Sequence, residues 1–389
     1  GTSMGGEVGS LYASGFSPEE ILFILASDEY VSMATGKYID KNIFFFKKED
    51  PDASWVNFKL SPNGTFSQMI PTGVVSSVAM DFRSLELLGM AEAAANYDFD
   101  SLFVPFRCVA SDIYRKKAVV LKDGNLTKAV RSTAAFPLYF NPISIDSTLL
   151  FDGGLYNNFP SDVMYADFYP DIILGSNVGS KYEAPLENDL FSQFRAMIVG
   201  ETKYETPCEN GVIIIPDMNV GTFEFDRANE AYLAGYESTI ARMDEIKAQV
   251  ARRENPETLA AKRIAFRKKF VPIKFDDITI EGLTPSQQVY VRRSLLKHNR
   301  IDDISIIKQR YLRIFSDDKI QSIYPSMILD TANSLYDLNL LIKKEKALKI
   351  GIGGNFASRP VTTGLISAKY NYSAIKLSIF SVALIAETV

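Results

Sequence analysis

The segment Gly1-Thr2-Ser3-Met4-Gly5 places a serine between two glycines, with one residue separating it from each. The G-x-S-x-G spacing is typical of a nucleophile elbow, where a strand turns sharply into a helix and exposes the serine hydroxyl. Glycines at such a turn let the backbone bend tightly and let the helix pack closely. Ser3 is therefore a candidate nucleophile, with an incidental serine in a glycine-rich turn as the alternative.

A serine nucleophile needs a base, and histidine is a poor candidate in this chain. The sequence has a single histidine, His298, which we expect at the end of a helix in a different domain from Ser3. A carboxylate or a lysine is then the expected base. Asp152, in the segment FDGG, follows an apolar strand, and sites in open α/β sheets assemble at the carboxyl ends of strands. The alternative for Asp152 is an ordinary Asp-Gly turn.

Alternating helices and strands must position these two residues. Ser17, Pro18 and Glu20 combine an N-cap, a proline at the first helical position and a capping-box glutamate, so they predict a helix start. Residues 131–137, RSTAAFP, contain small side chains that suit a helix passing beneath the elbow, or simply a helix that ends at Pro137. We expect helices over 3–15, 90–97 and 124–135, and strands over 102–113, 117–121, 147–154 and 171–180. This alternation predicts an α/β sheet covered by helices.

The overall composition is that of a globular protein with two or three domains. The chain has 389 residues, of which 47% are hydrophobic and 23% charged, and its net charge of −5 gives no sign of a nucleic-acid partner. Its two cysteines, Cys108 and Cys208, exclude a disulfide scaffold and a thiolate metal cluster. No carboxylate-rich calcium loop is present in the sequence. Because the sequence starts inside the elbow and stops inside an apparent strand, we expect a fragment open at both ends.

The second half of the sequence follows a different pattern. Residues 226–269 are helical and increasingly basic, which favours a solvated linker helix over a contact with anionic lipid. Residues 271–345 read as strand, helix, helix, strand, strand. From residue 347 onward, apolar residues alternate with polar or small ones, as in an antiparallel sheet or an outer-membrane barrel. Residues 35–85, around Trp55, are expected to form a peripheral insertion.

Five segments in this order, GTSMGG, FRCVASDI, VRSTAAFPLYFNPI, LLFDGGLYNNFPSDV and DIILGSNVGS, resemble the patatin-like phospholipase family over about residues 1–250. The resemblance implies a three-layer α/β/α domain and a lipid acyl hydrolase without histidine, cofactor or metal. Ser3 then carries over as the nucleophile, Asp152 as the base, and the Met4 backbone N–H as an oxyanion donor. The motif glycines are Gly1, Gly5, Gly153 and Gly154. The family's first strand and glycine-rich oxyanion loop would precede Gly1, so we expect this chain alone to be inactive.

The later segments resemble a polypeptide-transport-associated (POTRA) domain over 271–346 and the first strands of an outer-membrane barrel over 347–389. With 251–270 as a basic helical linker, this order is similar to patatin-type autotransporters of Gram-negative bacteria. The resemblance implies a hydrolase in the bacterial outer membrane or cell envelope, with a phospholipid or lysophospholipid substrate. It also implies membrane contact through the C-terminal strands, polypeptide contact through the POTRA-like domain, and no nucleic acid. The competing hypothesis is a polypeptide-transport or outer-membrane assembly protein whose patatin-like part is a passenger or an inactive scaffold.

Overall fold

The computed structural model describes residues 1–38, 54–60, 72–179, 185–188, 190–200, 202–296, 301, 303–316, 319–356, 362–372 and 378–388. His298 and much of the predicted insertion lie outside these residues. The chain divides into two compact units. The first unit comprises Gly1–Tyr38, Gly73–Lys274 and Ser326–Asp337. The second unit comprises Ile39–Thr72, Phe275–Pro325 and Leu338–Val389.

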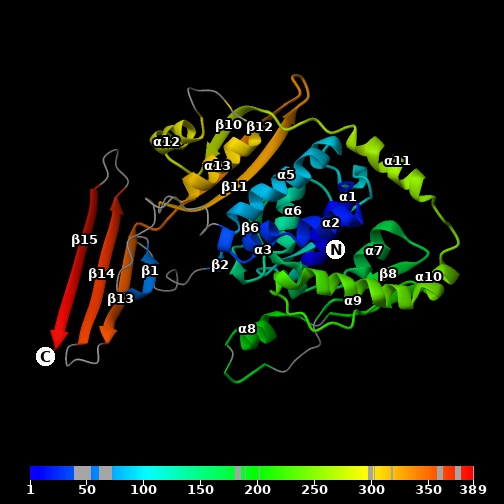
Figure 1. Ribbon diagram of the computed structural model, residues 1–389, viewed down its shortest axis with the longest axis horizontal. Coiled ribbons are helices and arrows are strands. Elements are labelled where there is room, and N and C mark those ends of the chain that lie inside the picture. Colours follow the sequence, from blue (N-terminus) through cyan, green and yellow to red (C-terminus); the bar gives the residue numbers. More distant parts are fainter. Residues whose placement is uncertain are drawn as a thin grey trace. The chain divides into compact units, whose positions relative to one another are not determined.

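The first unit contains most of the helices (Figure 1). They are α1 (Met4–Ala13), α2 (Pro18–Leu25), α3 (Asp28–Ala34), α5 (Val78–Ala94), α6 (Leu126–Thr133), α7 (Ser161–Phe168), α8 (Leu190–Ile198), α9 (Ala228–Ala241), α10 (Met243–Gln249) and α11 (Pro256–Arg267). The predicted start of α2 is confirmed, because the Ser17 side chain accepts from the Glu20 N–H while the Glu20 carboxylate accepts from the Ser17 N–H. This reciprocal capping satisfies two amides that the helix leaves unpaired.

The strands of the first unit are β2 (Gly73–Val75), β3 (Cys108–Asp112), β4 (Lys117–Leu121), β5 (Leu138–Phe140), β6 (Ile143–Ile145), β7 (Thr148–Asp152), β8 (Ile173–Ser176) and β9 (Gly211–Ile214). Four of them form an antiparallel sheet in the order β4-β3-β7-β6, while β2 pairs with β5 and β8 with β9 in parallel. Every residue of β3 is buried. The core joins Cys108 of β3 to Leu88 of α5, Leu126 of α6 and Leu11 of α1. The predicted α/β architecture is therefore confirmed.

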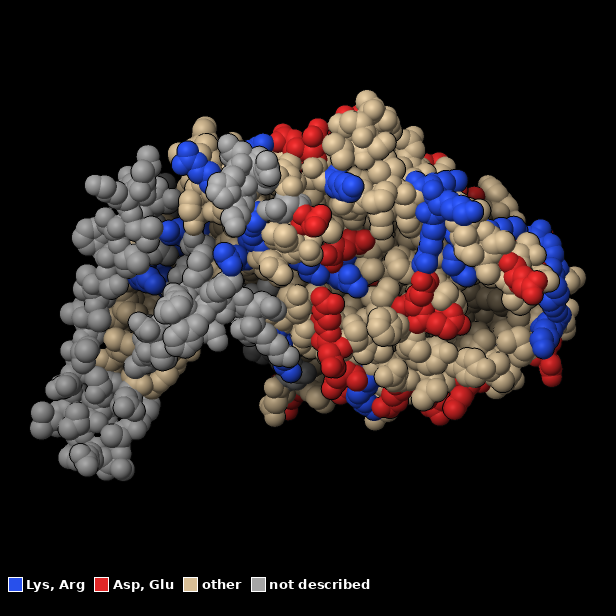
Figure 2. All heavy atoms as spheres, turned by 45° about the horizontal axis from the view of Figure 1, so that its top comes forward, with Lys and Arg blue, Asp and Glu red and all other residues tan. Residues whose placement is uncertain are grey.

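The basic helix α11 packs on the first unit through part of its surface. Arg267 donates two hydrogen bonds to the Glu20 carboxylate at 2.9 and 2.7 Å, and the Arg263 guanidinium lies 5.1 Å from the centre of the Phe103 ring. Phe266 is buried in the core. Figure 2 shows Lys and Arg side chains gathered at the right of the molecule, where Figure 1 places α11. The segment predicted as a solvated linker therefore belongs by its contacts to the first unit.

Two small sheets follow. The elements β10 (Phe275–Glu281), α12 (Pro285–Leu295), α13 (Ile304–Phe315), β11 (Ile320–Asp330) and β12 (Leu335–Lys344) occur in the predicted strand-helix-helix-strand-strand order. Their three strands pair as β10-β12-β11. The strands β1 (Ser54–Leu60), β13 (Leu348–Phe356), β14 (Thr362–Tyr372) and β15 (Ser378–Thr388) form an antiparallel sheet in that order. The described residues contain no helix long and apolar enough to cross a membrane.

Candidate active site

Ser3 lies at a sharp turn between an extended segment and α1. The Val109 N–H donates to the Gly1 carbonyl at 3.1 Å, and Thr2 pairs in parallel with Val109 of β3. Ser3 then adopts φ 51° and ψ −125° before the helix begins at Met4. A positive φ in a residue other than glycine costs on the order of 1–3 kcal/mol and persists only when the surroundings enforce it. The structure therefore contains the strained strand-to-helix turn that the sequence motif predicts.

The carboxyl ends of two chain segments meet along one edge of β3. β4 occupies one edge of β3, and β7 runs antiparallel along the other, where Asp152 lies opposite Ala110. Thr2 pairs in parallel with Val109, the residue next to Ala110, so the segment of Thr2 runs in the direction opposite to β7. Both segments thus run toward the same point from opposite sides. The two segments therefore share one edge of β3 and approach each other head-on.

This arrangement joins the two predicted site residues by a hydrogen bond. The Ser3 Oγ donates to Asp152 Oδ2 at 2.6 Å. The Gly154 N–H donates to the other carboxylate oxygen at 2.8 Å, and the Asp152 N–H donates to the Ala135 carbonyl at 3.0 Å. Asp152 is only 3% exposed. Burial raises its pKa from 3.8 to about 6, although the bonds from Ser3 and Gly154 oppose this rise. Asp152 is therefore a stronger base than a free aspartate, yet is ionised near neutral pH.

The end of α6 lies beneath the elbow, as the small residues of RSTAAFP suggested. The Ser3 N–H donates to Thr133 Oγ1 at 3.0 Å, and the Thr133 hydroxyl in turn donates to the Val109 carbonyl. A side chain at Gly6 would place its Cβ 2.5 Å from the Thr133 methyl group. Thr133 thus ties the strained turn to β3, and Gly6 allows α1 to approach it.

The motif glycines differ in their roles. A Cβ at Gly153 would lie 2.1 Å from the Val109 carbonyl oxygen, so close approach to β3 requires glycine there. A Cβ at Gly5 would meet no atom within 4 Å. The close packing that we expected to require glycine at this position is therefore not found. The Met4 N–H is the first amide of α1, one of those that a helix leaves without an intrahelical partner.

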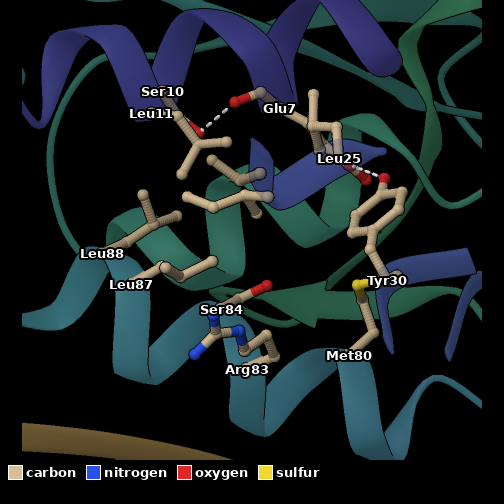
Figure 3. Close-up of a pocket in the computed structure, with 12 residues that line it drawn as sticks. Glu7, Ser10, Leu11, Leu25, Tyr30, Met80, Arg83, Ser84, Leu87 and Leu88 are labelled. Atoms are coloured by element: carbon tan, nitrogen blue, oxygen red, sulfur yellow. Dashed lines mark hydrogen bonds between the residues drawn. The ribbon is translucent and has the colours of Figure 1, made fainter. Parts of the chain in front are cut away.

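Two residues near the elbow were missed at the sequence level. Glu7 follows Ser3 by one helical turn, and its Oε2 accepts a hydrogen bond from the Tyr30 hydroxyl of α3 at 2.5 Å. Figure 3 shows Glu7 and Tyr30 at a cavity whose other walls are mainly apolar, including Leu87 and Leu88 of α5. The cavity has a volume of about 30 Å³. An acidic residue inside an otherwise small and apolar helix was the only available signal.

A buried ion pair flanks this region. Arg131 Nε lies 3.1 Å from Asp81 Oδ1, and Arg131 Nη2 donates to the Asn141 carbonyl at 2.6 Å. Burial raises the pKa of Asp81 to about 6, while Arg131 and the Ser77 hydroxyl oppose the rise. Within the described part of the chain, no group of three His, Cys, Asp or Glu side chains is arranged to hold a metal ion.

Comparisons with known proteins give one family match and several partial relatives. The model of the Patatin-like phospholipase family matches residues 1–165. Patatin-like phospholipase domain-containing protein 7 of Mus musculus is 29% identical over 119 residues, which cover 30% of this chain and 8% of the mouse protein. An uncharacterized NTE family protein of Mycobacterium tuberculosis is 34% identical over 68 residues, covering 18% of this chain and 12% of that protein. The chain thus spans only a small part of the length of these curated relatives. The matched residues 1–165 contain both Ser3 and Asp152 and are thus similar to a patatin-like phospholipase domain.

Proposed function

We propose that this domain hydrolyses carboxylic esters of lipids through Ser3 and Asp152. The observation that carries the proposal is the 2.6 Å hydrogen bond from the Ser3 hydroxyl to a buried carboxylate. The backbone strain at Ser3 and the two hydrogen bonds that the Asp152 carboxylate accepts, from Ser3 and Gly154, also support it. Strained backbone and buried carboxylates with shifted pKa values are concentrated at active sites. No histidine needs to take part.

The chemistry follows from the positions of the atoms. Ser3 Oγ attacks the ester carbonyl carbon while Asp152 Oδ2 takes the hydroxyl proton, and the carbonyl oxygen becomes an oxyanion. The Met4 N–H, the first amide of α1, donates to that oxyanion in this mechanism. Protonated Asp152 then gives its proton to the departing alcohol, leaving an acyl group on Ser3. Water, deprotonated by the same carboxylate, releases the acid and restores Ser3.

The proposed substrate is a phospholipid or a lysophospholipid. The family name supports a lipid ester, and Met4 and Val8 on the first turns of α1 expose apolar side chains at 36% and 38%.

We also propose that the last strands attach the protein to a bacterial outer membrane. β13, β14 and β15 have 9, 11 and 11 residues, and a strand crosses a bilayer in about 9–11 residues. The register supports a lipid-facing side, because Ile352 pairs with Ile366 and Ile350 with Ala368. Ile352 and Ile366 are 47% and 58% exposed.

A fluorophosphonate probe tests the proposed chemistry in the complete reading frame. We expect a covalent adduct on Ser3, located by peptide mass, that is absent in Ser3→Ala and lost in Asp152→Asn. Ser10→Ala, which alters another serine of α1, is the matched control and should keep the adduct. Absence of the adduct in the folded wild-type protein would contradict the hydrolase proposal.

The second candidate is a polypeptide-transport or assembly protein. The strand-helix-helix-strand-strand order of β10 to β12 favours it, since this order resembles a POTRA domain, in which a polypeptide would add as a strand to the sheet. A protein that binds unfolded polypeptide but never labels with the probe would support this candidate.

A further inference from the structure

Glu7 occupies a position that the dyad chemistry does not explain. It follows Ser3 by one turn of α1, and its backbone N–H donates to the Ser3 carbonyl at 3.1 Å. Its side chain lines the cavity between α1 and α5 (Figure 3). A carboxylate in such a place is poorly solvated and needs a specific donor.

Tyr30 is that donor. Its hydroxyl lies 2.5 Å from Glu7 Oε2, its side chain is 7% exposed, and its ring contacts Phe225 edge-on at 6.4 Å. Burial and the neighbouring Glu7 carboxyl raise the pKa of Tyr30 well above 10, so the phenol remains a donor at any physiological pH. The Glu7 carboxyl is thus fixed in one orientation by a side chain that is itself packed.

The pair is electrostatically connected to the dyad. Burial raises the pKa of Glu7, while the Tyr30 bond and the charge of Arg131 oppose the rise. When Glu7 is ionised, its charge raises the pKa of Asp152 in turn. The titratable and charged groups on the elements around Glu7 include Glu20 of α2, bound to Arg267, then Tyr30 of α3, Asp81 and Arg83 of α5, Arg131 of α6, Tyr139 of β5 and Asp152 of β7. The same helices also carry Glu19 (α2), Asp28 and Glu29 (α3), Glu86 and Glu92 (α5) and Lys128 (α6).

We propose that Glu7 is a positioning residue of the site: held by Tyr30 one turn after Ser3, it sets the pH range in which Asp152 accepts the serine proton. The proposal rests on the proposed hydrolase function. Its physical basis is that two carboxyl groups in one poorly solvated site ionise less easily together than apart. Removing the charge of Glu7 should therefore make Asp152 ionise at lower pH and act as a weaker base.

The test is the pH dependence of kcat/KM in the complete protein with p-nitrophenyl butyrate, a soluble ester. In Glu7→Gln, which keeps the size and an acceptor for Tyr30, we expect the acid limb to move to lower pH by several tenths of a unit. We expect kcat/KM at the plateau to fall by no more than a few-fold. Tyr30→Phe should move the limb in the same direction, because without its donor Glu7 stays protonated to higher pH. Glu19→Gln, on the exposed side of α2, is the control and should leave the profile unchanged.

An unmoved acid limb in Glu7→Gln would overturn the proposal, and so would an equal loss of kcat/KM at every pH in the folded variant. The titration of Asp152 can also be followed without turnover, from the ¹³C carboxyl signal that Asp152→Asn removes. If the wild-type protein hydrolyses no ester, the proposed function fails, yet this signal still decides the role of Glu7. An Asp152 titration that is identical in wild type and Glu7→Gln would refute the coupling.

Discussion

Replacing Asp152 with asparagine should abolish hydrolysis and, at neutral pH, stabilise the domain. Burial raises the pKa of Asp152 from 3.8 to about 6. Between these two pH values the folded state holds a proton that the unfolded state has released. The stability that protonated Asp152 contributes is therefore fully present below its unfolded-state pKa of 3.8 and is lost as the pH rises to its folded-state pKa of about 6. Asparagine carries no charge to desolvate and escapes this loss.

The size of the effect follows from the same two values. Because the pKa of Asp152 rises from 3.8 to about 6 on folding, the ionised carboxylate lowers the free energy of unfolding by about 3 kcal/mol above pH 6. In Asp152→Asn, the bonds that the new amide group would form with Ser3 and Gly154 differ from those of the carboxylate, so about 3 kcal/mol is an upper bound. Below the ordinary pKa of an aspartate, the advantage of the variant should vanish.

Asp112 provides a matched control of opposite sign in the same sheet. Its carboxylate accepts from the Tyr114 and Arg115 N–H groups and pairs with the Arg115 side chain at 2.9 Å. These bonds lower its pKa, so its contribution to stability is present at neutral pH and is lost on acidification. Asp112→Asn should therefore destabilise the domain at neutral pH, with a cost that shrinks toward low pH.

Hydrogen exchange of the β3 and α1 amides, followed by mass spectrometry, is the suitable assay. The single tryptophan, Trp55, lies in the second unit, so its fluorescence does not report on this domain. We expect slower exchange in Asp152→Asn than in wild type at neutral pH and no difference in acid. If Asp152→Asn exchanged faster at neutral pH, as Asp112→Asn should, the reasoning about burial would be refuted.

Three further predictions concern the surroundings of the dyad. Thr133→Val should lower stability, because it leaves the Ser3 N–H and the Val109 carbonyl without their hydroxyl partner, at about 1–3 kcal/mol each; Thr133→Ser should retain most of the stability in thermal unfolding. Gly153→Ala should abolish probe labelling of Ser3, because its Cβ would lie 2.1 Å from the Val109 carbonyl oxygen, and a variant that labels normally would contradict the packing argument. His298→Ala should keep ester hydrolysis within a few-fold of wild type, and a complete loss would restore a histidine-based triad.

The central pair of the site could be predicted because both residues lie in short motifs whose chemistry is local. The spacing around Ser3 indicates a turn, and the glycines after Asp152 indicate close backbone approach, which the distance at Gly153 explains. The argument against a histidine base rested on the sequence alone, because the chain has a single histidine. The two motifs could not predict that the segments of Ser3 and Asp152 approach each other along one edge of β3. This arrangement depends on strand pairing rather than on either motif.

Other features depend on contacts between distant segments. The Glu7–Tyr30 bond joins two helices whose relative packing has no sequence signature. The strand around Trp55 was expected in a peripheral insertion, yet β1 pairs with β13, and the ion pair Lys59–Glu345 joins residues 286 positions apart. Alternation along a strand predicts its two faces but not its partner. Such pairings are therefore found only in the folded chain.

The chain alternates between the two units, and this bears on whether a protease could release the first unit, which contains Ser3 and Asp152. The backbone passes between the units at five places, after residues 38, 72, 274, 325 and 337. A single cut, for example after the basic helix α11, would leave four covalent connections intact. Release of the first unit as a separate piece would thus require several cuts. This connectivity favours a domain that stays covalently joined to the rest of its chain.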